Sequence, residues 1–167
     1  MLSFKTDRFS LRRIDPQVEN LTNYLSWLRD TQNSFISGIN PTMTLMELKE
    51  YIFAKNSKTN CLLLGIYVNT NFHIGNIKAE PIDTLNRTCW IGILIGEKKW
   101  RGKGVAQETI SELTKTLNKD LQINKFYLGV DRDNSAAIRA YTKMGFCWES
   151  DKTMSLELKD LIKTIDI

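Results

Sequence analysis

An apolar run that ends in a basic, glycine-containing turn constrains this chain more than any other feature. Residues 91–95 have the composition of a buried strand, residues 96–104 contain three glycines and four cations, and helical spacing runs from Gln107 to Leu117. A helix after such a turn directs its free N–H groups and positive dipole end back at the turn. The stretch therefore predicts a pyrophosphate site, with added positive charge from Lys98, Lys99, Arg101 and Lys103.

Two better-known phosphate-binding loops do not match these residues. A Walker A loop counted from Gly96 requires glycine where Arg101 stands, and the Gly102-Lys103 pair is followed by Gly104 instead of a hydroxyl residue. A dinucleotide fingerprint counted from Gly102 requires a small residue where Gln107 stands, and it opens its fold instead of lying near residue 100. The sequence therefore argues against a P-loop nucleoside triphosphatase and against a Rossmann dehydrogenase.

Two separated segments resemble the GNAT superfamily of N-acetyltransferases. Residues 101–106, Arg-Gly-Lys-Gly-Val-Ala, are similar to its acyl-CoA loop, Gln/Arg-x-x-Gly-x-Gly/Ala. Residues 134–146, from Asn134 through Tyr141 to Gly145-Phe146, are similar to its later Asn-x-x-Ala-x-x-x-Tyr-x-x-x-Gly-Phe segment. Residues 24–30 and 74–77 resemble the branch with ribosomal-protein N-terminal and nucleotide-linked amino-sugar acetyltransferases. The order and separation of the two motifs match the family.

The resemblance implies a set of residues that bind acetyl-CoA. Main-chain groups of Ile93, Leu94 and Ile95 would bind the pantetheine arm, and without the resemblance these three are ordinary core residues of a strand. The pyrophosphate would be held by the loop residues Arg101, Gly102, Lys103, Gly104, Val105 and Ala106, which would otherwise form a solvated turn. Asn134 is a good helix N-cap in its own right, and in the family it also hydrogen-bonds pantetheine.

The resemblance also implies a catalytic tyrosine, but it leaves the general base open. Tyr141 lies seven residues after Asn134, two helical turns on, and would act as general acid toward the leaving thiolate unless it is only a core aromatic. Two positions where relatives carry a glutamate hold Trp90 and Gly129 here. The base is therefore unassigned among Glu80, Asp131, Glu97 and a water chain.

Hydrophobic periodicity predicts an α+β fold in one domain over residues 1–167. Strands are expected at 9–13, 62–68, 73–82, 88–95, 125–130, 146–148 and 153–158. Helices are expected from Asp15-Pro16 to about Leu28, from the capping box at Thr44 to about Ala54, from 107 to 117, and from Asn134 to Gly145. A loop is expected at 34–41. The family fold would be a mostly antiparallel seven-stranded sheet with one splayed parallel pair and helices on both faces.

Composition argues against several classes of function but does not indicate one. The net charge of +4 is modest and scattered, so the chain is not expected to bind nucleic acid. The three cysteines are far apart and His73, expected to be solvent-exposed, is the only histidine, so no metal site is predicted. No signal-like or membrane-length apolar run is present, and buried thiols suit a reducing cytoplasm, so a cytoplasmic protein without a membrane partner is expected.

We therefore expect acetyl transfer from acetyl-CoA to a primary amine by direct attack in a ternary complex, because no cysteine lies near the reacting ends of the motifs. The acceptor would be an amino-sugar nucleotide, a protein N-terminus or another small amine, and residues 34–44 with the early helices and the last hairpin would select it. A homodimer is left open. The alternative is a non-catalytic acyl-CoA-binding or regulatory module, which the missing glutamates favour.

Overall fold

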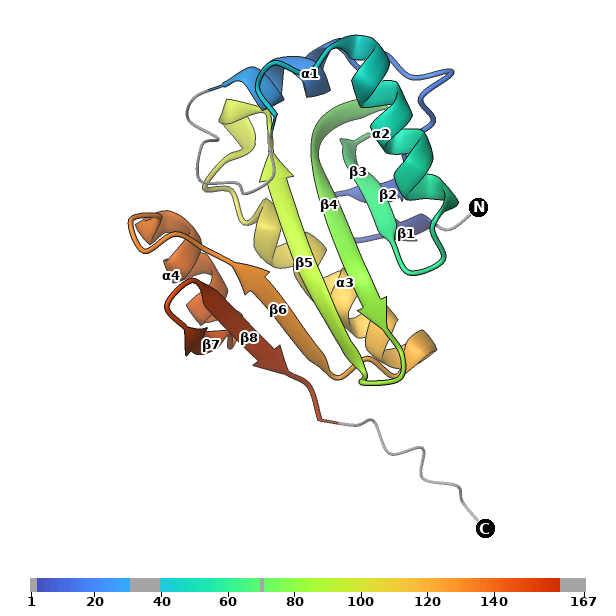
Figure 1. Ribbon diagram of the computed structural model, residues 1–167. Helices are drawn as coiled ribbons and strands as arrows, with labels where there is room; N and C mark the ends of the chain where they lie inside the picture. The colour runs from blue at the N-terminus through green and yellow to red at the C-terminus, as the bar shows by residue number, and fades with distance from the viewer. Residues whose placement is uncertain (1–2, 31–39, 70, 160–167) are drawn as a thin grey trace.

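The computed structural model describes residues 3–30, 40–69 and 71–159, and these residues form an eight-stranded sheet covered by helices (Figure 1). The strands are β1 (Ser3–Lys5), β2 (Ser10–Arg13), β3 (Leu62–Val68), β4 (Phe72–Asp83), β5 (Thr88–Ile95), β6 (Lys125–Gly129), β7 (Cys147–Ser150) and β8 (Thr153–Glu157). Their order is β1-β2-β3-β4-β5-β6-β8-β7, and only the β5–β6 pair is parallel.

The predicted mixed, mostly antiparallel architecture is confirmed, but the predicted count of seven strands is wrong. The extra strand is β1, which pairs with β2 from Ser3↔Arg12 to Lys5↔Ser10. Three residues are too few to show the alternation by which strands are identified in a sequence. The expected loop over 34–41 lies mostly at residues 31–39, outside the described residues.

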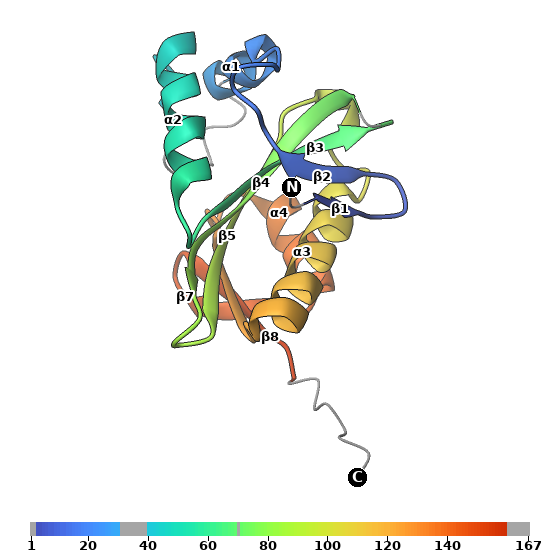
Figure 2. The same cartoon turned by 90° about the vertical axis from the view of Figure 1, so that its right-hand side faces the viewer.

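Helices pack against both faces of the sheet, as the continuous apolar sequence of β3 requires. Leu62, Leu64 and Ile66 join the core beneath α3 (Val105–Leu121) and α4 (Ser135–Lys143). Leu63 points the other way and joins a second core with α1 (Thr22–Arg29) and α2 (Leu45–Ser57). Figure 2 shows α1 and α2 on one side of the sheet and α3 on the other. No helix among the described residues is both long and apolar enough to span a bilayer.

The ends of the helices test the predicted caps. Thr44 makes both bonds of the capping box with Glu47, so α2 starts where predicted, and it runs three residues beyond Ala54 to Ser57. Asn134 caps α4 as expected, with its side chain accepting from the N–H of Ala137. The prediction for the first helix is wrong at its start, because Asp15 caps only a turn through Gln17 and the helix begins at Thr22.

The parallel pair separates after three residues, and this position determines where a ligand can enter. The β5–β6 ladder joins Thr88, Cys89 and Trp90 to Lys125, Phe126 and Tyr127, and then stops, although β5 continues to Ile95 and β6 to Gly129. Figure 1 shows the two strands diverging in a V, with α4 beside β6. The expected splay is therefore confirmed.

Candidate functional site

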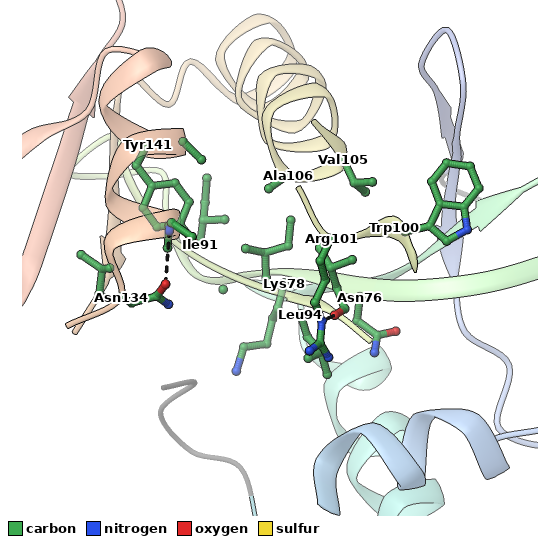
Figure 3. Close-up of a pocket in the computed structure, with 18 of the residues that line it drawn as sticks. Asn76, Lys78, Ile91, Leu94, Trp100, Arg101, Val105, Ala106, Asn134 and Tyr141 are labelled. Carbon is green, nitrogen blue, oxygen red and sulfur yellow. Dashed lines mark hydrogen bonds between the residues drawn. The ribbon is translucent and has the colours of Figure 1, made fainter. Parts of the chain in front are cut away.

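A cavity of about 1120 Å³ opens at the V and extends beneath α1 and α2. Its walls come from α1, α2, β4, β5, the start of α3, the end of β6 and α4 (Figure 3). Every cofactor-binding or catalytic residue that the family resemblance implies lines this cavity except Lys103. Residues from 24 to 143 in the sequence are thus brought to one place by the fold.

The strand wall of the cavity offers main-chain hydrogen-bonding groups. In an antiparallel ladder, alternate residues of a strand direct N–H and C=O groups away from their partner. Beyond Trp90, the groups of β5 that face away from β4 meet no described strand on the β6 side. Ile93, Leu94 and Ile95 all line the cavity there. Because buried backbone groups require partners, this edge is suited to an extended chain of amides.

The loop wall of the cavity offers a second set of N–H groups. Gly102 and Gly104 have φ of +69° and +76°, a left-handed backbone that favours glycine. A Cβ atom placed on Gly102 would meet no protein atom within 4 Å, so the backbone there faces open space. Gly104 is the N-cap of α3 and supplies no side-chain cap. The first turn of the helix, with Val105, Ala106 and Gln107 in the wall, can therefore bind an anion through its N–H groups.

The cations of this stretch do not all lie where the sequence suggested. Arg101 lines the cavity, but its guanidinium donates to the carbonyls of Ile95 (2.9 Å) and Gly96 (3.1 Å) and lies 3.6 Å from the carboxylate of Asp30. Arg101 thus braces the end of β5 against α1.

The neighbouring lysines do not line the cavity, and their expected contribution to the phosphate site stays a prediction. Lys98 lies 3.5 Å from Asp30, and the Lys99 ammonium lies 4.5 Å from the centre of the Phe72 ring. Both line a separate depression against α1, and Lys103 is exposed. The short 3-10 helix Lys98–Trp100 turns their side chains away from the cavity.

Helix α4 brings both of its predicted residues to the same wall. The Asn134 side-chain oxygen accepts from the N–H of Ala137 at 3.2 Å, so the Asn134 amide nitrogen is the donor that can meet a ligand. Tyr141 is buried, with its ring 6.0 Å from that of Phe146. Burial raises the pKa of Tyr141 to about 12, because the apolar surroundings disfavour the phenolate. Tyr141 therefore keeps its proton, so its hydroxyl can donate a hydrogen bond.

The three acidic candidates for the general base lie in different places. Glu80 is the only acidic residue among the described residues that line the cavity. Burial opposes its ionisation, but hydrogen bonds from Lys55 and Lys58 outweigh burial and lower the pKa of Glu80 to about 2. A carboxylate this weakly basic is poorly matched to an amine. Glu97 lines the separate depression, and Asp131 is exposed in the loop before α4.

The opposite end of the cavity contains polar residues that the sequence interpretation missed as a group. Asn76, Lys78 and Glu80 point from the same face of β4 into the wall beneath α1 and α2. Two-residue spacing in an otherwise apolar strand was the available signal. A bulge lies just before this row, because Ile66 pairs with Gly75 while Tyr67 pairs with His73, so Ile74 is an extra residue.

Two expectations about single residues are corrected by packing. His73 is not solvent-exposed: its ring stacks on Tyr67 at 4.7 Å, contacts Tyr24 and Trp27, and bonds through Nε2 to the Asn76 oxygen at 2.9 Å. The thiols of Cys61 and Cys89 are buried as expected, but that of Cys147 is exposed, because β7 lies at the edge of the sheet.

Comparisons with known proteins agree with this architecture. The family model of the acetyltransferase (GNAT) domain matches residues 8–147. An N-acetyltransferase 9-like protein from Caenorhabditis briggsae is 29% identical over 83 residues, which is 46% of this chain and 42% of that protein. The match thus spans less than half the length of this curated relative.

Solved structures share the fold at low sequence identity. The spermidine N-acetyltransferase of Vibrio cholerae, in complex with CoA and spermine, has a TM-score of 0.81 at 18% identity over 92% of this chain and 97% of that chain. The ribosomal-protein-S5-alanine acetyltransferase of Vibrio fischeri has a TM-score of 0.80 at 12% identity over 96% and 98%. Because the family model spans most of its length, this chain belongs to the GNAT acetyltransferase family.

Proposed function

We propose that this chain transfers the acetyl group of acetyl-CoA to a primary amine by direct attack while both substrates are bound. The observation that carries the proposal is one continuous wall: the β5 edge that β6 leaves unpaired leads through Gly102 and Gly104 into the uncapped start of α3. Tyr141 of α4 lines the same cavity. Amide-binding, anion-binding and proton-donating groups thus follow one another along one surface.

The residues present suit coenzyme A. The strand edge would hold the amides of pantetheine, and the glycine loop with the first turn of α3 would hold the pyrophosphate. Binding through main-chain groups explains why the strand side chains can remain apolar. Arg139 and Lys143 of α4 also line the cavity and add positive charge beside an anionic cofactor.

When bound, acetyl-CoA supplies a thioester whose carbonyl carbon an amine can attack. A main-chain N–H of β5 would donate to the acyl oxygen as negative charge develops on it. The C–N bond forms as the C–S bond breaks, and Tyr141 donates its hydroxyl proton or a hydrogen bond to the departing sulfur. A pKa of about 12 makes hydrogen bonding the stronger contribution, because complete transfer from Tyr141 to a thiolate is uphill.

The proton lost by the amine has no carboxylate of ordinary basicity to receive it among the described residues of the cavity. We infer that it leaves through water. This observation also favours the second candidate, a module that binds acyl-CoA without turnover. Catalysis in the cytoplasm and a homodimeric assembly remain predictions.

Thiol release separates the two candidates. Acetyl-CoA would be incubated with amino sugars, peptides with free N-termini and polyamines, and free CoA would be followed with a thiol reagent. An enzyme releases CoA only when a suitable amine is present, and mass spectrometry detects the acetylated product. Tight binding of CoA without turnover of any amine would instead establish the binding module.

A further inference from the structure

The row of polar residues on β4 limits the chemical class of the acceptor amine more narrowly than membership of the family does. Asn76 and Lys78 stand opposite Leu94 and Gly92 of β5, in register. Gly92 is exposed and has no side chain, so nothing from β5 covers Lys78. Figure 3 shows the Lys78 side chain extending into the open middle of the cavity.

Positive charge exceeds negative charge at this end of the cavity. The Lys55 ammonium lies 2.5 Å from one carboxylate oxygen of Glu80, and the Lys58 ammonium lies 2.9 Å from the other. The Lys78 ammonium lies 3.4 Å from the same carboxylate. One carboxylate thus faces three ammonium groups. Lys78 is the most weakly paired of the three, and its side chain is 34% exposed. The net charge of this cluster is therefore positive, and Lys78 presents it to the cavity.

The remaining described walls supply no second acid. Besides Lys55, the helices above contribute Tyr24, Leu28, Leu48 and Tyr51, all uncharged. The described walls therefore offer a cationic acceptor little to bind here.

Asn76 adds a hydrogen-bond donor without a partner. It is 4% exposed, and its amide nitrogen has no hydrogen-bond partner among the described residues. Its oxygen is held at 2.9 Å by Nε2 of His73. Burial lowers the pKa of His73, so the ring is neutral and can donate from Nε2. This bond keeps the Asn76 oxygen on the histidine and presents the nitrogen as the donor. A buried donor without a partner is costly, so an acceptor oxygen is expected to meet it.

These two donors are distinct from the site proposed for pyrophosphate. Lys78 is in register with Gly92, three residues before the end of β5, which is about 10 Å of strand. The glycine loop lies beyond that end. The anionic groups of coenzyme A therefore do not account for Lys78.

We propose that the acceptor amine also carries an oxyanion, a carboxylate or a phosphate, bound by the Lys78 ammonium and the Asn76 amide nitrogen. The inference rests on the acetyltransferase function proposed above and narrows its substrate class. Polyamines are repelled by the same charge that attracts such an acceptor.

Matched pairs of amines test this proposal. One pair is glycylglycine and glycylglycinamide, which differ in a carboxylate, and the other is glucosamine 6-phosphate and glucosamine, which differ in a phosphate. Spermidine represents polycations. We expect kcat/KM for at least one anionic member to exceed that of its neutral partner by about 10- to 100-fold, as a charge-assisted hydrogen bond supplies. The pair that responds identifies the oxyanion.

Substitution of Lys78 assigns the preference to this site. Lys78→Gln should raise KM for the preferred anionic amine about tenfold or more. It should leave KM for the neutral amine of the same pair and the affinity for CoA unchanged. Lys78→Arg, which keeps the charge, should retain most of the preference. Lys115→Gln is the matched control, because Lys115 is exposed on α3 and does not line the cavity.

The outcomes distinguish this proposal from the proposed function. Equal kcat/KM within both pairs, a preference for spermidine, or an unchanged preference in Lys78→Gln would overturn it while amine acetylation stands. If no amine turns over, calorimetric titration of the five amines into CoA-saturated protein tests the oxyanion site directly. Tighter binding of an anionic member supports the oxyanion site, and failure of both anionic members to bind more tightly than their partners refutes it.

Discussion

At the scale of single residues, burial decides which proton donor the site contains. Tyr141 lies at the edge of the core, and its raised pKa of about 12 fixes it in the protonated form. The same burial makes Tyr141 a packing residue for α4 against Phe146. Tyr141 can serve both purposes, because its ring packs against Phe146 and the residue also lines the cavity.

Tyr141→Phe tests the role of that hydroxyl. We expect kcat to fall by about 100-fold with little change in KM for acetyl-CoA, because the hydroxyl acts on the departing sulfur and not on cofactor binding. Steady-state thiol release measures both constants. Tyr127→Phe is the control, since Tyr127 stacks on Trp90 and does not line the cavity. An unchanged kcat in Tyr141→Phe would show that Tyr141 has only a packing role.

Glu80 provides a prediction about stability and pH. Its pKa in the folded protein is about 2, below the ordinary 4.5, so its contribution to stability is complete above pH 4.5 and is lost as the pH falls toward 2. Glu80→Gln should therefore lower the free energy of unfolding by about 2 kcal/mol at pH 7. Urea unfolding should show this difference shrinking between pH 4.5 and pH 2. A difference that is constant over that interval would contradict the ion-pair explanation.

At the scale of elements, the start of α3 shows how a turn prepares a binding site. Glycine with positive φ ends the loop, and the helix begins without a side-chain cap, so its first N–H groups stay available. Helix α2 differs, because a capping box between Thr44 and Glu47 occupies two N–H groups at its start. The helix that follows the proposed cofactor loop thus begins without a side-chain cap.

Gly104→Ala should weaken cofactor binding. A left-handed backbone costs alanine about 1–2 kcal/mol, so the loop should shift, and we expect the Kd for CoA to rise about tenfold. Gln122→Gly at the other end of α3 is the matched control, because Gln122 has a φ of +58°. Glycine there should stabilise the fold slightly and leave CoA binding unchanged. Equal Kd values for Gly104→Ala and the parent would show that this turn does not shape the site.

At the scale of the whole molecule, sequence patterns predicted what depends on neighbours in the chain. Apolar runs identified β3 and β5 at their observed bounds, and the capping residues identified α2 and α4. The motif from Arg101 to Ala106 and the tyrosine of α4 indicated which segments would meet, and the structure places them around one cavity.

Local sequence patterns could not predict the contacts between segments that lie far apart in the chain. Arg101 is predicted from the sequence as a phosphate ligand, but no sequence pattern indicated that its guanidinium also lies against Asp30 of the α1 segment and the end of β5. His73 follows a turn and is polar, but Trp27 and Tyr67 enclose it. The bulge at Ile74 changes which face of β4 each side chain occupies, and it leaves no mark in local composition. Each depends on packing that only the assembled sheet and helices create.

Calorimetric titration of CoA tests most directly whether the unpaired edge of β5 and the start of α3 bind the cofactor. We predict one saturable binding event per chain, tighter for CoA than for ATP by at least about tenfold, because ATP lacks the pantetheine arm that the strand edge would hold. Absence of heat with both CoA and acetyl-CoA, or equal affinity for ATP, would contradict the assignment of this cavity.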